Sequence, residues 1–291
     1  MNNSQIRYEI FLKVAELGNI TLAADALSYT QSGVSHAIAA MEREAGCTLF
    51  HRSKFGVTLT DSGKALLPLV QELINKQHSL DQAMDALSNR VAGTLRVGSF
   101  TSFTATWMAL LIQDFTEKFP EVKVELTNGT YRDIENGITD GRLDCGFLSA
   151  IENDPLDFTP LFDDPMMVIM SPQHELAKKK SLPLQDLKKY PLISQFQGSD
   201  HDVQQIFKKA KIRPKTKYIL DDDISVMGMV AHNEGIALMP EMMLETASFD
   251  LDAIPLDPAQ RRTIGLATLL IKETTLLVRT FVAFCKGYDF N

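Results

Sequence analysis

Apolar side chains recur at helical spacing from the start of the chain. The first set consists of Ile6, Ile10, Phe11, Val14 and Leu17. Gly18 follows this set directly, and because glycine is common just past a helix end, we expect the first helix to end there. Thr21 is predicted to cap a second helix that runs to Leu27. The two segments indicate a helical N-terminal domain.

A third helix is predicted over residues 31–45, after a turn at residues 28–30. Val34, Ile38 and Met41 step by four and by three, which places them on one buried stripe. Gly46 lies just past the predicted end of this helix. Two short helices joined by a tight turn, the second with a polar outer face, are typical of a helix-turn-helix.

Two short strands are predicted directly after the third helix, at residues 49–52 and 57–60. The residues between them include Gly56, which favours a tight hairpin turn. A hairpin at this place is typical of a winged helix-turn-helix, and Arg52 and Lys54 near its tip could contact DNA phosphates. For these two bases an ordinary solvated turn is the alternative.

A seven-residue apolar repeat follows the hairpin. Its positions, at steps of four and three, are Leu66, Val70, Leu73, Gln77, Leu80, Met84 and Leu87. Such a stripe predicts a long helix that pairs with a second copy of the chain, with Gln77 fixing the register. Packing of the stripe on its own domain is the alternative, and Pro68 is expected to bend the helix.

From about residue 91 the pattern changes to alternating strands and helices. Strands are predicted at 94–98, 122–127 and 144–149, with helices at 104–118 and 131–140. This alternation predicts a parallel sheet with right-handed crossovers. A second set of strands (166–170, 192–196, 216–220, 236–239) and helices (203–210, 224–233) precedes a last strand (264–271) and a closing helix (275–286).

Composition and charge narrow the class of protein. The 291 residues exceed what one compact core usually organises, and 45% hydrophobic with 23% charged residues is ordinary for a globular chain. Without a long apolar run or a signal peptide, we expect no membrane span and a cytoplasmic location. The net charge of −8 lies outside residues 1–60, where five bases balance five acids. The acidity of the whole chain therefore does not argue against DNA binding by residues 1–60.

No motif for catalysis or metal binding is present. Cys47, Cys145 and Cys285 are far apart and form no C-x-x-C, which favours free thiols over a disulfide or a zinc site. Glycine-rich nucleotide motifs and a nucleophile elbow are absent, and His174-Glu175 lacks the second histidine of H-E-x-x-H. We therefore expect no catalytic residues, no metal and no cofactor.

A dense set of small, apolar and polar residues covers the first sixty or so positions: Phe11, Ala15, Gly18, Ala23, Ala24, Leu27, Gln31, Val34, Ser35, Ile38, Glu42, Gly46, Leu49, Phe50, Arg52, Leu59, Thr60 and Gly63. This set resembles the winged helix-turn-helix signature of LysR-type transcriptional regulators. Three positions depart from it: Ser32 where proline is frequent, Asn19 where serine is usual, and Phe55 where the wing is often basic. The later strands and helices resemble the effector domain of the same family in their order.

The resemblance implies a chain of mixed α+β and α/β class. Its expected parts are a winged helix-turn-helix DNA-binding domain (1–60), a long linker and dimerisation helix (61–90), and a two-lobed α/β effector domain like a type 2 periplasmic binding protein (91–291). Lobe 1 is expected at 91–161 plus 264–291, and lobe 2 at 162–263. The implied function is a transcriptional regulator that binds double-stranded promoter DNA and a small-molecule effector. Its implied assembly is a homodimer that forms a homotetramer on DNA.

Eight residues are predicted to contact DNA. The first turns of the third helix would enter the major groove, and its polar residues could meet base edges: Gln31, Ser32, Ser35 and His36, with Arg43 on the same face. Thr21, Arg52 and Lys54 are better placed for phosphates. For His36 the alternative is a solvated surface histidine.

Effector residues are predicted where parallel strands end and helix N-termini begin, since ligands bind there in such sheets. The predicted residues are Ser99, Phe100, Thr101, Ser102, Asn128, Ser149, Gln195, Phe196 and Ser225. For the hydroxyls among them, helix capping is the alternative. Asp221, Asp222 and Asp223 are predicted to cap the helix at residue 224, with repulsion of anionic effectors as the alternative.

Three functions compete on this basis. The first is a ligand-responsive transcriptional regulator. The second is a small-molecule receptor or enzyme whose N-terminal domain binds protein, and the third is a constitutive architectural DNA binder with a vestigial cleft. Binding to a promoter fragment separates the first from the second. A change at Thr101 that keeps DNA affinity but abolishes the response separates the first from the third. The resemblance favours the first.

Overall fold

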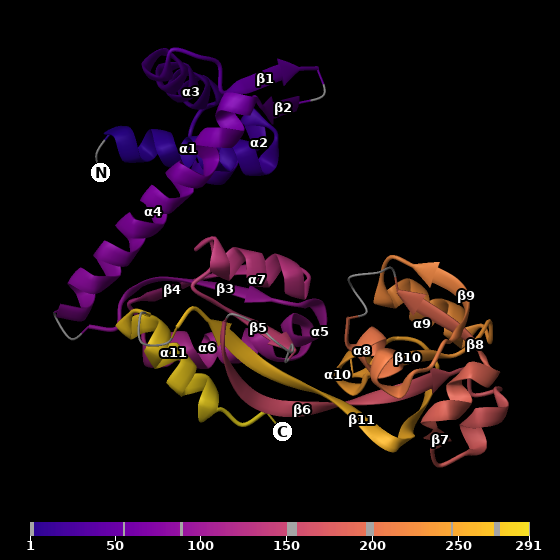
Figure 1. Cartoon of the computed structure of the whole chain (residues 1–291). Coiled ribbons are helices and arrows are strands. Elements are labelled where there is room, and N and C mark those ends of the chain that lie inside the picture. Colours follow the sequence, from indigo (N-terminus) through magenta and orange to yellow (C-terminus); the bar gives the residue numbers. More distant parts are fainter. Residues whose placement is uncertain are drawn as a thin grey trace. The chain divides into compact units, whose positions relative to one another are not determined.

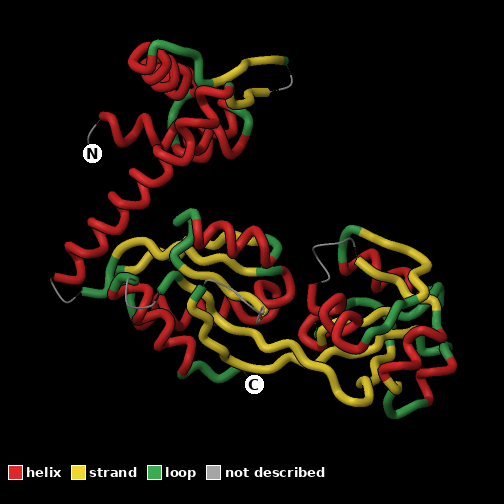
Figure 2. Tube along the Cα trace, viewed as in Figure 1, coloured by secondary structure: helices red, strands yellow, loops and turns green. Residues whose placement is uncertain are grey.

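The computed structural model describes residues 3–54, 56–87, 90–149, 156–195, 201–245, 247–270 and 274–290. The chain forms two compact units, residues 1–84 and residues 85–291, with the short stretch 140–142 grouped with the first unit. The first unit is helical with one small hairpin, and the second has two mixed α/β lobes (Figures 1 and 2). The predicted mixed fold class is confirmed.

The N-terminal unit contains the predicted helix-turn-helix and hairpin. Its elements are α1 (Asn3–Leu17), α2 (Ile20–Leu27), α3 (Gln31–Ala45), β1 (Phe50–Ser53) and β2 (Gly56–Leu59). Phe11, Val34 and Ile38 are fully buried in the core that the three helices share. Gly18 and Gly46 have φ of +59° and +67° just past α1 and α3, as the glycine positions predict.

The predicted cap of α2 is wrong by two residues. Asn19 is the N-cap residue, and its Oδ1 accepts the backbone N–H groups of Thr21 at 2.8 Å and Leu22 at 3.2 Å. An asparagine directly before a helix reaches the second and third amides, whereas a threonine inside the first turn cannot. Thr21 is an exposed residue of that first turn.

A single long helix, α4 (Asp61–Leu87), follows the hairpin and continues through Pro68. Leu66 is half-buried and Val70 is buried in the core of the N-terminal unit. At these two positions the stripe therefore packs on its own domain, contrary to the prediction that they pair two chains. Beyond them, Leu73, Leu80 and Met84 are 51%, 54% and 60% exposed.

Lobe 1 contains the predicted parallel sheet. Strands β3 (Gly93–Ser99), β4 (Val122–Asn128) and β5 (Cys145–Ser149) lie parallel, with β3 in the middle. The first crossover begins with α5 (Thr101–Phe103), passes one π-helical turn (Thr104–Met108) and continues as α6 (Ala109–Lys118). Helices α7 (Tyr131–Thr139) and α11 (Leu276–Lys286) complete the lobe.

Lobe 2 has the same plan on a smaller scale. Strands β8 (Pro191–Gln195) and β9 (Lys215–Leu220) are parallel, and β10 (Ala237–Pro240) lies against β6. Its helices are α8 (His201–Ala210), α9 (Asp223–Ala231) and α10 (Glu241–Leu244). A short strand, β7 (Leu182–Pro183), lies between two 3₁₀ turns (Glu175–Lys178 and Leu184–Lys189).

Two long antiparallel strands, β6 (Asp157–Met170) and β11 (Asp252–Thr268), run through both lobes. Figure 1 shows them side by side from one lobe to the other. The prediction gave each strand only its apolar end, residues 166–170 and 264–271, and was wrong about their lengths. The remaining stretches carry Pro, Asp and Arg, which read as loops although they form the connection between the lobes.

None of the described helices is both long enough and apolar enough to cross a membrane.

Candidate nucleic-acid interface and ligand cleft

Helix α3 presents polar side chains on the side opposite its buried stripe. Gln31, Ser32, His36 and Arg43 are exposed and Ser35 is half-buried, while Val34, Ile38 and Met41 are at most 5% exposed. The structure therefore places all five predicted residues of α3 outside the core, four of them exposed. Their contact with bases stays a prediction.

The start of α3 is held by a residue that the sequence reasoning overlooked. Thr30 is its N-cap, and the Thr30 Oγ1 accepts the Gly33 N–H at 3.1 Å. The Oγ atoms of Thr30 and Ser32 are also 3.1 Å apart, within hydrogen-bond distance. The signal was a threonine directly before the first helical residue, which favours capping. This cap fixes the turn that carries Gln31 and Ser32.

The hairpin is tied to the helices by two sets of hydrogen bonds. The Glu42 Oε1 on α3 accepts the N–H groups of Leu49 at 2.8 Å and Phe50 at 3.3 Å. The Val57 N–H donates to the Gly18 carbonyl at 2.8 Å. Because the wing is held near the start of each strand, Arg52, which is exposed on β1 and pairs with Val57, has a defined position relative to α3. Lys54 is exposed in the turn, and Phe55 lies outside the described residues.

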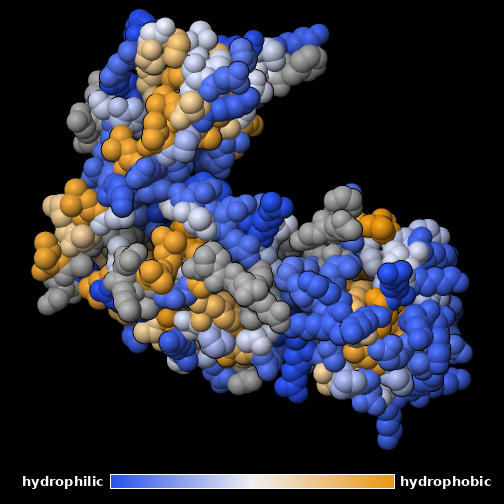
Figure 3. Space-filling model, in the orientation of Figure 1, coloured by the Kyte–Doolittle hydropathy of each residue, from blue (hydrophilic) through white to orange (hydrophobic). Residues whose placement is uncertain are grey.

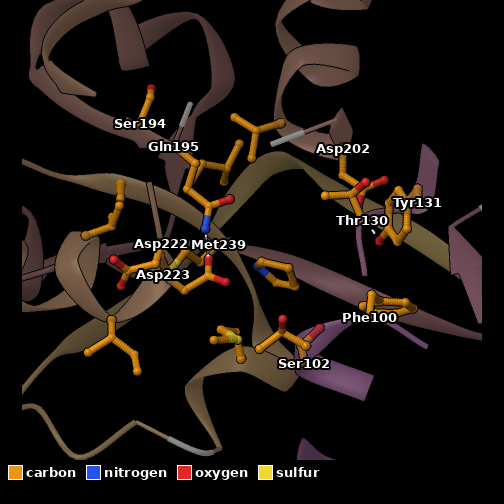
Figure 4. A pocket seen from close by; sticks show the side chains of 18 of the residues that line it. Phe100, Ser102, Thr130, Tyr131, Ser194, Gln195, Asp202, Asp222, Asp223 and Met239 are labelled. Atoms are coloured by element: carbon orange, nitrogen blue, oxygen red, sulfur yellow. Dashed lines mark hydrogen bonds between the residues drawn. The ribbon is translucent and has the colours of Figure 1, made fainter. Parts of the chain in front are cut away.

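A cavity of about 410 Å³ lies between the two lobes of the second unit. Lobe 1 contributes the residues that follow β3, the end of β4 and the start of α7, and lobe 2 contributes β8, β10 and the starts of α8 and α9. Figure 4 shows Phe100, Ser102 and Tyr131 on one side and Gln195, Asp222 and Asp223 on another. The size and position are those of a small-molecule site at the carboxyl ends of parallel strands.

Five of the predicted effector residues line this cavity, namely Phe100, Thr101, Ser102, Asn128 and Gln195. Ser99 and Ser149 are 0% and 2% exposed and do not line it. The Ser99 Oγ instead accepts the Thr104 hydroxyl at 2.8 Å. Ser225 binds Asp222 at the start of α9 and is likewise not a lining residue. Phe196 lies outside the described residues.

Arg262 on β11 is the centre of a buried polar network that joins both lobes. Its side chain is 6% exposed and lies 2.7 Å from Asp164 on β6, itself 3% exposed. The Nη1 group donates to the Tyr131 hydroxyl at 3.0 Å and to the Asp202 carboxylate at 3.5 Å. The Nη2 group donates to the Ser102 Oγ at 2.9 Å. Since Ser102 and Tyr131 belong to lobe 1 and Asp202 to lobe 2, Arg262 connects the walls of the cavity.

The sequence reasoning missed Arg262, Asp164, Tyr131 and Asp202. Arg262 falls in the stretch read as a loop before the last strand, so nothing marked it as buried. The Tyr131 hydroxyl donates to Asp202 at 2.9 Å, and burial raises the pKa of this tyrosine far above its usual range. Tyr131 therefore stays protonated at neutral pH and can donate to Asp202 there.

The distal half of α4 carries an exposed apolar surface, which we call the α4 stripe: Leu73, Leu80, Met84 and Leu87. Leu87 is 89% exposed, and Gln77 lies half-buried within the stripe. Figure 3 shows apolar side chains gathered over this end of the helix. Large apolar side chains that follow one another on one helix face are typical of a surface that pairs with another protein.

A winged helix-turn-helix joined to a two-lobed domain with a cleft defines a class of ligand-responsive DNA-binding proteins. Residues 7–64 match the family described as bacterial regulatory helix-turn-helix protein, lysR family, and residues 88–289 match the LysR substrate binding domain. The chain belongs to the LysR family of DNA-binding transcriptional regulators with an effector-binding domain.

Relatives and solved structures agree with this family. The uncharacterized HTH-type transcriptional regulator YvbU of Bacillus subtilis is 30% identical over 284 residues, which cover 96% of each chain. The fold of full-length CbnR complexed with its target DNA is similar, with a TM-score of 0.70 at 21% identity over 98% of this chain and 99% of that one. The effector binding domain of QuiR in complex with shikimate has a TM-score of 0.59 at 24% identity, over 67% of this chain and 95% of that one.

Proposed function

We propose that this regulator binds two-fold symmetric promoter sites as a homodimer and responds to a small-molecule effector in the cleft between its lobes. The observation that carries the proposal is α3, whose polar side chains are exposed apart from the half-buried Ser35, while its opposite stripe is buried. The proposed DNA contacts are the eight predicted residues, with Thr21 kept as an exposed side chain at the start of α2. Residues 1–60 would bind DNA, the α4 stripe within 61–90 would pair the chains, and 91–291 would bind the effector, with lobe 1 at 91–161 plus 264–291 and lobe 2 at 162–263.

In the proposed mechanism the effector shifts a population of conformations. A ligand that contacts both walls of the cavity favours the closed arrangement of the lobes over an open one. Closure changes how effector domains pair in a homotetramer, and so changes the spacing of helix-turn-helix pairs and the bending of DNA. The Tyr131–Asp202 hydrogen bond and the Arg262 network support this mechanism, because they join the lobes directly at the cavity.

The relatives are transcriptional regulators, so we propose that the chain regulates transcription without catalysing a reaction. We also propose that it does so in the cytoplasm, where promoter DNA lies.

The first test selects bound fragments from genomic DNA and measures their affinity by fluorescence anisotropy. Thr101→Val, an exposed position of the cavity wall, is expected to leave DNA affinity within twofold and to abolish the effector response. A Thr101→Val protein that still responds fully would place the effector elsewhere.

The α4 stripe is the surface through which we propose that two chains pair. Leu80→Glu is expected to raise the dimer dissociation constant at least a hundredfold, because two leucines lose about 1.5–3 kcal/mol of burial each. Sedimentation equilibrium measures this change. Leu69→Glu is the matched control, since Leu69 is 62% exposed on the same helix but off the stripe. A Leu80→Glu protein as dimeric as the Leu69→Glu control would show that the chains pair elsewhere.

A further inference from the structure

The charge of the cavity wall is strongly one-sided. Among the described lining residues, five are acidic, namely Asp133, Asp202, Asp221, Asp222 and Asp223, and only Arg262 is basic. Residues 150–155 and 196–200, which lie outside the described ranges, contain no lysine or arginine in their sequence. An anionic ligand would therefore enter a cavity that carries a net negative charge.

Arg262, the one basic residue among the described lining residues, is already paired with carboxylates of the chain. Arg262 lies 2.7 Å from Asp164 and 3.5 Å from Asp202, so two carboxylates already surround one guanidinium. Its remaining donors bind the Tyr131 and Ser102 hydroxyls. Binding an anion here would require breaking buried ion pairs, which is costly.

Two of the helix N-termini that face the cavity, those of α7 and α9, are occupied by the chain's own carboxylates, whereas α5 begins at the cavity without a side-chain cap. At α7 the Asp133 carboxylate accepts the Thr130 N–H at 3.0 Å and the Thr130 hydroxyl at 2.7 Å. At α9 the Asp222 carboxylate accepts the Ser225 N–H and hydroxyl, both at 2.7 Å. This confirms the predicted capping by Asp222. At α7 and α9, amides of the kind that bind an anion in other proteins are thus satisfied internally.

The remaining carboxylates are suited to a cation. Asp221 is exposed at the cavity and has no hydrogen-bond or ion-pair partner among the described residues. Asp223 accepts from the Gln195 amide. Burial raises the pKa of Asp223, and a cation placed beside it would oppose this rise. Apolar side chains form another part of the wall, including Met166, Val226 and Met239.

We propose that the effector of this regulator is an organic cation, with a protonated amine or guanidinium group on an apolar body. The positive group lies at Asp221 and Asp223, and the apolar body lies against the methionine and valine side chains of the wall. The inference rests on the proposed function, in which this cavity is the effector site. It extends the alternative raised for the three aspartates, because they would attract a cation as well as repel an anion.

The test compares three probes of equal length, pentylamine, 1-pentanol and pentanoate, with the full-length protein. Isothermal titration calorimetry at low salt is expected to give a dissociation constant for pentylamine at least tenfold below that for pentanoate. Asp221→Asn is expected to weaken pentylamine at least threefold and to leave 1-pentanol unchanged. Asp250→Asn, which removes the same charge from an exposed position away from the cavity, is expected to change neither.

Two outcomes would overturn the inference. If pentanoate binds as tightly as pentylamine and Thr101→Val weakens it, the cavity is the effector site but the assigned charge is wrong. If none of the probes binds at 10 mM, or if Asp221→Asn and Asp250→Asn weaken pentylamine equally, the cation site is wrong as well. Neither outcome changes the DNA-binding part of the proposed function, which the Gln31→Ala variant of α3 decides separately.

Discussion

Replacing Arg262 with methionine is expected to destabilise the effector domain by about 3–5 kcal/mol, because the change leaves a buried carboxylate without its counter-ion. Asp164 is 3% exposed, and apart from Arg262 it accepts the Met242 N–H at 3.1 Å. One amide cannot replace a guanidinium. Guanidinium chloride unfolding, followed by the fluorescence of Trp107, the chain's single tryptophan, which lies in the second unit, measures the loss.

Two further variants make this prediction specific. Arg261→Met is the matched control, since Arg261 is 62% exposed and lies 3.9 Å from Asp163, and such exposed pairs contribute about 0–1 kcal/mol. The double change Arg262→Met with Asp164→Leu is expected to recover most of the loss, because removing both buried charges removes the desolvation penalty. An Arg262→Met protein that unfolds at the same denaturant concentration as the parent would contradict the assigned role.

Gln31→Ala is expected to lower affinity for the selected promoter site by at least thirtyfold while leaving the fold intact. A side-chain amide that pairs with an adenine edge contributes about 1–3 kcal/mol of discrimination, and a symmetric dimer loses two such contacts. Gln31 is exposed in the first turn of α3, and the cap of that turn comes from Thr30, so removing the Gln31 side chain breaks no internal contact that holds the helix. Fluorescence anisotropy against specific and unrelated duplexes measures both affinities.

The control for this variant is Gln113→Ala, which makes the same substitution at an exposed position of α6 in the other unit. It is expected to leave both affinities unchanged. The result that counts is the ratio of specific to unrelated binding, because phosphate contacts contribute equally to both. A Gln31→Ala protein with the parent's ratio would mean that α3 does not read this base.

The N-terminal unit was the easier part to predict, and the reason is physical. Each helix there buries one stripe against the same small core, so the spacing of Phe11, Val34 and Ile38 is enough to locate it. Caps were harder. Asn19 and Thr21 are both good capping residues, and only the exact first residue of α2 decides between them.

The position of the cleft, at the carboxyl ends of the parallel strands, was predicted correctly, but only some of its polar side chains were. Hydroxyl and amide residues at strand ends follow from topology, and Phe100, Ser102 and Gln195 do line the cavity. Arg262 could not be found this way. Its burial depends on β6 and β11 running through both lobes, and polar residues in such strands look like loop residues when only hydrophobic periodicity is read.

Helix α4 has a mechanical consequence. Val70 is buried with the side chains of α1 and α3, and the same unbroken helix of 27 residues continues into the α4 stripe. A rod about 40 Å long thus begins inside the domain that holds α3. If two α4 helices pair through their far ends, a rotation of one helix against the other also rotates the two DNA-binding domains against each other. In each chain α4 is continuous with the domain that holds α3, so the rotation passes directly to that domain.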